Sequence, residues 1–168
     1  VLTSPSDLSR IAGEIYRRHC DGHKIVAVVS AYYGQTDQLL GEAAIIEHTL
    51  DSASQFTADL VSLGEDRTAA GLAIACDKLG LNVKLQRAET LGLTLDGPSN
   101  GADVVNFDPS NILRDLTSAD VVIVPGFVGV DQAGNRALLK RGGSDLSAAV
   151  IAAQLGAQRL CLYKDVDG

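Results

Sequence analysis

Several features that would point to particular classes of protein are missing from this sequence. Its 168 residues carry 14 lysines and arginines against 21 aspartates and glutamates, which gives a net charge of −7, and no basic cluster stands out. This balance argues against nucleic acid or an anionic membrane as a partner. No apolar run approaches the ~20 residues that a membrane-spanning helix needs. A signal-peptide pattern is also absent, so we expect a cytoplasmic protein.

Two kinds of site signature are missing as well. Cys20, Cys76 and Cys161 lie far apart and are odd in number, and the three histidines form no cluster, so we expect no metal site built by the protein. Cys76 and Cys161 fall on apolar faces and are predicted to be small buried hydrophobes. The Gly-x-x-x-x-Gly-Lys-Ser/Thr phosphate loop is absent too, so nucleotide binding cannot depend on that motif.

What the sequence does contain predicts one α/β domain. Hydrophobic residues make up 46% of the chain, enough for a substantial core. Helices and β-branched strands alternate, as in a parallel sheet. We expect strands at 24–30, 82–85, 104–107, 120–124 and 159–163, with 120–124 central. We expect helices at 5–22, 37–50, 58–63 (ended by Gly64), 68–79, 110–116 and 146–155, a loop at 91–100 and a hairpin within 128–139.

The segment from Lys140 to Leu146 indicates an anion-binding loop. Gly142 and Gly143 let the backbone approach a ligand, and Ser144-Asp145 is predicted to cap the following helix. A helix N-terminus attracts anions, and the Arg141 guanidinium suits a carboxylate or a phosphate. Loops in such sheets gather at the carboxyl ends of the strands. We therefore group residues 30–36, 125–129, 141–145 and 164–168 into one site.

Five blocks in this order resemble the signatures of aspartokinases, in the amino-acid kinase superfamily. The first two are Val29 to Asp37 (Val-Ser-Ala-x-x-Gly-x-Thr-Asp) and Ser62 to Glu65 (Ser-x-Gly-Glu). The others are 124–129 (Pro-Gly-Phe-x-Gly), 141–145 (Arg-Gly-Gly-Ser-Asp) and 163–168 (Tyr-x-Asp-Val-Asp-Gly). The resemblance implies a three-layer α/β/α sandwich with a mainly parallel central sheet. It also implies one partial kinase domain over 1–168, incomplete at both ends and without a regulatory domain.

The resemblance implies phosphotransfer from Mg²⁺-ATP to the side-chain carboxylate of L-aspartate, giving aspartyl phosphate for lysine, threonine and methionine biosynthesis, in a homo-oligomer. Arg141 would bind the substrate carboxylate, Glu65 its ammonium, and Thr36 would contact the substrate. Ser144 and Asp145 would act near the reacting groups. The residues implied on the nucleotide side are Ser30, Gly34, Gly142, Gly143, Lys164 and Asp165.

Each assignment has a plainer alternative that the sequence leaves open. Gly142-Gly143 could be a tight turn, Glu65 could charge the start of the helix at 68–79, and Thr36-Asp37 could cap a helix. Asp165 and Asp167 could form turns. Tyr32 and Tyr33 could pack in the core or form a wall of the substrate site.

The sequence also departs from the family pattern. Lys140 replaces a glycine, Lys164 replaces a threonine, and Asp66 replaces the arginine after Gly-Glu, with Arg67 one place later. The family's Lys-x-Gly-Gly strand would precede Val1, so we expect these residues alone to be weakly active. Two alternatives remain: a diverged, non-catalytic module that binds amino acids or nucleotides, and a kinase for another amino-acid-like substrate.

Overall fold

The computed structural model describes residues 2–47 and 54–163. Its helices are α1 (Pro5–Cys20), α2 (Gln35–Glu47), α3 (Gln55–Asp77), α4 (Ala88–Leu91), α5 (Ser110–Leu116) and α6 (Gly143–Gln154). Its strands are β1 (Ile25–Val29), β2 (Val83–Leu85), β3 (Leu93–Asp96), β4 (Asp103–Phe107), β5 (Val121–Pro125), β6 (Val128–Val130) and β7 (Arg136–Leu138). No helix in the described part of the chain is both long enough and apolar enough to cross a membrane.

A three-stranded parallel sheet sets the direction of the fold. Its strand order is β1-β5-β2, and β5 pairs with both neighbours. All five residues of β5 are buried, which confirms the prediction that this strand is central. Because β1 and β5 run in parallel, with Val29 opposite Pro125, the segments that follow them leave the sheet at the same end.

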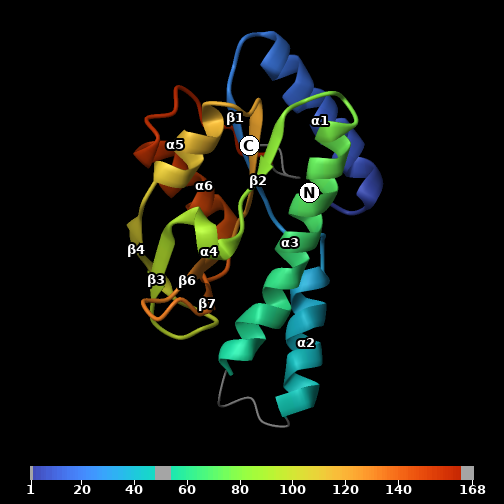
Figure 1. Cartoon of the computed structure of the whole chain (residues 1–168). Coiled ribbons are helices and arrows are strands. Elements are labelled where there is room, and N and C mark those ends of the chain that lie inside the picture. The colour runs from blue at the N-terminus through green and yellow to red at the C-terminus, as the bar shows by residue number, and fades with distance from the viewer. Residues whose placement is uncertain (1, 48–53, 164–168) are drawn as a thin grey trace.

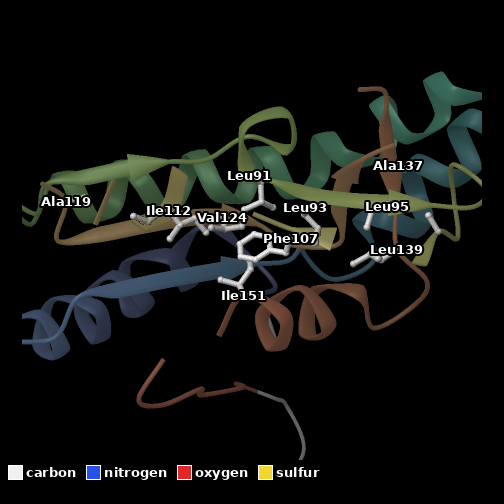
Figure 2. Close-up of a cluster of buried hydrophobic side chains, with 12 residues drawn as sticks. Leu91, Leu93, Leu95, Phe107, Ile112, Ala119, Val124, Ala137, Leu139 and Ile151 are labelled. Atoms are coloured by element: carbon white, nitrogen blue, oxygen red, sulfur yellow. The ribbon is translucent and has the colours of Figure 1, made fainter. Parts of the chain in front are cut away.

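Helices cover both faces of this sheet, which confirms the expected three layers. Figure 1 shows α1 and the upper half of α3 on one face, with α5 and α6 on the other. Leu72 of α3 packs with Ile123 on the first face, and Ile151 of α6 packs with Val124 on the second. Figure 2 shows this second cluster, with Phe107 of β4 beside Ile151. Continuous apolar strands suit a sheet buried on both sides.

A second sheet, with strand order β4-β3-β6-β7, adjoins the end of the first. The antiparallel pair β6-β7 is the hairpin predicted within 128–139. The loop predicted at 91–100 is wrong, because residues 93–96 form β3 between β4 and β6. Leu93 and Leu95 are fully buried and alternate with Thr94 and Asp96, a strand pattern in a short segment.

The break predicted at Gly64 is also wrong, since α3 runs without interruption from Gln55 to Asp77. Gly64 instead allows α3 to pack closely against the segment that follows β1. A Cβ at this position would lie 2.8 Å from the Ala31 Cβ, so the helix can reach the segment after β1 only with glycine here. Glu65 therefore lies in mid-helix. The alternative that it charges the start of a helix at 68 is excluded.

The strand predicted at 159–163 is not formed. These residues belong to no sheet of the described chain, and Leu160 and Leu162 are 45% and 49% exposed. Cys161, predicted to be buried, is exposed as well. Cys76 is buried as predicted, and burial raises the pKa of its thiol to about 11.

Candidate active site

One groove gathers the predicted site residues that the structure describes. It begins at the carboxyl ends of β1 and β5 and is lined by Ser30, Gly34, Thr36, Glu65, Arg141, Gly142, Gly143, Ser144 and Asp145. Lys164 and Asp165 lie outside the described residues, as does Asp167. The groove extends along β1 to residues 157–163 and has a volume of about 1770 Å³. That exceeds the ~300–1,000 Å³ of usual ligand sites, so a small ligand would fill only part of it.

The start of α6 differs from the predicted cap. Gly142, at φ +84°, is the N-cap, so Ser144 and Asp145 lie in the first turn of the helix and neither is the N-cap residue. The left-handed conformation favours glycine at this position. Gly143 is needed for packing, because a Cβ there would lie 2.5 Å from the Leu139 Cβ and 2.8 Å from the Phe127 ring. The two glycines are thus a tight turn that also brings backbone N–H groups to the groove.

The turn after β5 is pressed against this helix start. Phe127 has φ +68°, a left-handed conformation that is uncommon without glycine. Its N–H donates to the Ser147 hydroxyl at 3.2 Å, and that hydroxyl donates to the Gly143 carbonyl at 2.9 Å. A Cβ on Gly126 would lie 2.9 Å from the Ser144 Cβ. The loops carrying Phe127 and Ser144 are therefore fixed against each other.

Glu65 is the most unusual ionisable group that lines the groove. It is 2% exposed, and its Oε1 accepts a hydrogen bond from the Ala31 N–H at 3.2 Å. Its Oε2 is buried and has no hydrogen-bond partner among the described residues. Burial, assisted by the negative charge of Asp66, raises the pKa of this carboxyl to about 7. A buried carboxylate with a free oxygen is suited to bind a cationic group of a ligand.

Arg141 contrasts with Glu65. Its side chain is 91% exposed, and its Nη2 lies 2.8 Å from the Asp37 Oδ1 in an ion pair that joins α2 to the loop before α6. The sequence did not single out Asp37 for this contact. Thr36 and Asp37 lie in the first turn of α2, after Gly34 at φ +76°, so neither is the helix cap. An exposed guanidinium that holds one carboxylate can exchange it for another.

The two undecided tyrosines have different surroundings. Tyr32 is half-buried, packs against the cluster that contains Leu72, and carries the Arg67 guanidinium 5.3 Å from its ring centroid. Tyr33 is 79% exposed. Both tyrosines line the groove. Tyr32 therefore packs in the core and also forms part of the groove wall, whereas Tyr33 is an exposed part of that wall.

A partly buried ionic cluster beside Glu65 was not predicted from the sequence. Arg136 of β7 bonds from Nη1 to Ser62 at 2.5 Å and to Asp66 at 2.7 Å, and from Nε to Glu89 at 2.7 Å. Arg87 lies 3.7 Å from the other Asp66 oxygen. The cluster ties the hairpin to α3. The sequence feature that could have indicated the cluster is Asp66, which stands where the family pattern has an arginine and, once partly buried, needs a positively charged partner.

Comparison with known proteins shows the family of the chain. The chain matches the Amino acid kinase family over residues 1–168. It is 33% identical to the aspartate kinase of Pseudomonas fluorescens SBW25 over 161 residues, which cover 96% of this chain and 39% of that protein. It is also 33% identical to the aspartokinase of Helicobacter pylori 26695, over 88% of this chain and 36% of that protein. The chain thus spans less than half the length of these relatives.

Solved structures show the same fold. Escherichia coli aspartokinase III in complex with aspartate and ADP superimposes with a TM-score of 0.72 at 19% identity, over 90% of this chain and 44% of that chain. Aspartate kinase from Synechocystis gives 0.73 at 26% identity, over 93% and 25%. The family match covers this chain from end to end, and the chain shares its fold with these kinases. The chain therefore belongs to the amino acid kinase family.

Proposed function

We propose that the protein to which this chain belongs is an aspartokinase, which transfers the γ-phosphoryl group of ATP to the side-chain carboxylate of L-aspartate. The observation that carries the proposal is the pairing of opposite charges in one groove. Glu65 presents a buried, unpartnered carboxyl oxygen, and Arg141 presents an exposed guanidinium. A ligand with both an ammonium and a carboxylate matches this pair, and the similarity to aspartate kinases favours aspartate.

In this proposal the residues of the chain mainly position and neutralise the reactants, as phosphoryl transfer requires. Arg141 binds the α-carboxylate, Glu65 binds the ammonium, and Thr36 contacts the substrate beside them. The substrate's free carboxylate oxygen attacks the γ-phosphorus, and the bond to the ADP oxygen breaks. Ser144 and Asp145 lie near the reacting groups.

The phosphates of ATP would lie at the N-terminus of α6, where Gly142 and Gly143 offer backbone N–H groups. Ser30, Gly34, Lys164 and Asp165 complete the nucleotide side of the proposal. In the described part of the chain, no three His, Cys, Asp or Glu side chains gather as a metal cage. Magnesium is commonly held by one or two carboxylates and by the phosphates themselves. Asp145 is the carboxylate that we expect to face it, and the ion would neutralise the transferring phosphoryl group.

The test is to trap the product. The protein is incubated with Mg²⁺-ATP, hydroxylamine and either L-aspartate, L-glutamate or N-acetylglutamate, and hydroxamate is measured. We expect a signal that needs both ATP and L-aspartate and that falls at least about tenfold in Glu65→Gln, because the ammonium contact is lost. A signal with another acid would make this a kinase for that acid. Calorimetric binding of L-aspartate with no product from the full-length protein would make it a binding module instead.

A further inference from the structure

We propose that Arg136 is a positioning residue for substrate binding: acting through Asp66, it favours the charged form of the Glu65 carboxyl and holds this group in place for a cationic group of the ligand. The inference depends on the proposed role of Glu65, but concerns a residue outside the groove. Arg136 is not among the residues that line the groove, so it would act without touching substrate.

The first step is positional. Arg136 Nη1 binds Ser62 at 2.5 Å and Asp66 at 2.7 Å, two residues one turn apart on α3. Glu65 lies within this turn, so the two contacts fix how α3 is rotated about its own axis and therefore where the Glu65 side chain points. The Arg136 side chain is only 14% exposed and Ser62 is fully buried, so the contacts of Arg136 with Ser62 and Asp66 have little room to shift.

The second step is electrostatic. Asp66 adjoins Glu65, and its negative charge opposes ionisation of the Glu65 carboxyl, which burial already disfavours. Arg136 lies 2.7 Å from one Asp66 oxygen and Arg87 lies 3.7 Å from the other. Burial opposes the charge of Arg136, but the hydrogen bonds to Glu89 and Asp66 outweigh it and raise its pKa. Arg136 therefore stays cationic and offsets the charge of Asp66.

Other charged groups lie around Glu65 and limit this effect. Asp66 and Arg67 adjoin Glu65 on α3, and Arg136 bonds to Asp66. The titratable side chains that line the groove with Glu65 include Tyr32, Asp37, Arg141 and Asp145, and further ones come from α1 and from residues 157–163. Arg141 and Asp37 pair with each other, and Arg67 stacks on Tyr32. Arg136 is thus the cation bonded directly to the acid beside Glu65.

The cluster also explains the departure at position 66. Where the family pattern has an arginine after Gly-Glu, this chain has an aspartate. Arg136, from the β6-β7 hairpin, places a positive charge next to this aspartate.

The experiment compares three variants: Arg136→Gln, Arg136→Lys and the double change Arg136→Gln with Asp66→Asn. The midpoint of the Glu65 carboxyl titration is measured by carbon-13 NMR, with Glu65→Gln to assign the signal. We expect Arg136→Gln to move the midpoint upward by on the order of one pH unit, because the charge of Asp66 is no longer offset. The lysine variant, which keeps the charge, and the double variant, which removes both charges, should stay near the parent.

Calorimetric titration with L-aspartate is the second readout. A midpoint raised from about 7 by one pH unit makes Arg136→Gln about fivefold weaker than the parent at pH 7 and nearly equal at pH 9, where Glu65 is ionised in both. Circular dichroism establishes that each variant is folded at the temperature used. The double variant separates loss of charge balance from loss of packing.

Two results would overturn the inference. One is an unchanged Glu65 midpoint in Arg136→Gln. The other is an affinity that falls by the same factor at pH 7 and pH 9, which would mean that Arg136 acts on structure alone. If the parent protein binds no L-aspartate at either pH, the proposed function fails, while the NMR titration still decides whether Arg136 controls the charge of Glu65.

Discussion

Two arginines on either side of β7 occupy opposite environments, Arg136 at its first residue and Arg141 in the loop that follows it. Arg136 is 14% exposed and bonds to three side chains on α3 and α4, whereas Arg141 is 91% exposed and pairs with Asp37. A buried guanidinium surrounded by partners is part of the framework, since moving it would leave its acids unpaired. An exposed guanidinium with a screened partner can release it to a ligand. The sequence gives both residues the same side chain, and only their surroundings separate their roles.

The largest expected effect is on the free energy of unfolding, and it tests the contrast between the two arginines directly. Arg136→Met should lower the free energy of unfolding by about 3 kcal/mol, because it leaves Asp66 without its closest cation. Arg141→Met, the matched control, should change it by less than about 1 kcal/mol. Urea denaturation at pH 7 measures both. Equal effects of the two substitutions would show that burial does not separate the two arginines.

The next prediction concerns pH. Because the pKa of Glu65 is raised to about 7 from its usual value of 4.5, the folded chain holds this proton to a higher pH than the unfolded chain does. Between these two pH values the unfolded chain has lost the proton that the folded chain keeps, so stability falls as pH rises and then levels off. We expect a loss of up to about 3 kcal/mol, at ~1.4 kcal/mol per pH unit.

The Glu65→Gln variant sharpens this prediction. It lacks the titrating group, so its advantage in unfolding free energy over the parent should grow from pH 4.5 to pH 7 and then stay constant. Denaturation curves at pH 4.5, 6 and 7.5 measure the difference. A constant difference across this range would mean that Glu65 titrates normally.

The smallest expected effect concerns Asp37. Its replacement by asparagine frees Arg141 from the ion pair and should raise the affinity for L-aspartate by no more than about fivefold, because exposed pairs contribute up to ~1 kcal/mol. Asp103→Asn is the matched control: it breaks a similarly exposed pair with Lys140 at 2.6 Å, and neither of these two residues lines the groove. Weaker binding in Asp37→Asn would indicate that Asp37 orients Arg141 for the ligand.

Local patterns predicted the central parallel strand, the hairpin and the loops after the strands, and the family resemblance added Thr36 and Glu65, which line the groove with them. β-branched runs mark buried strands, and glycines with polar neighbours mark the loops after them. The sequence-based predictions failed where a contact between residues far apart in the sequence determines the structure. Gly64 looked like a helix breaker, but its role is the approach of Ala31, more than thirty residues away. Arg136 and Asp66 are 70 residues apart, and no local pattern predicts that they meet.

The central claim is that Glu65 and Arg141 bind the two oppositely charged groups on the α-carbon of one zwitterionic ligand, and a cycle of ligands and variants tests it most directly. Calorimetry at pH 8 would compare L-aspartate with succinate, which lacks the ammonium, and with β-alanine, which lacks the α-carboxylate. We predict that Glu65→Gln weakens binding of L-aspartate at least about tenfold but not that of succinate, and that Arg141→Lys weakens L-aspartate but not β-alanine. If each variant weakened all three ligands equally, or none of them, the claim would be contradicted.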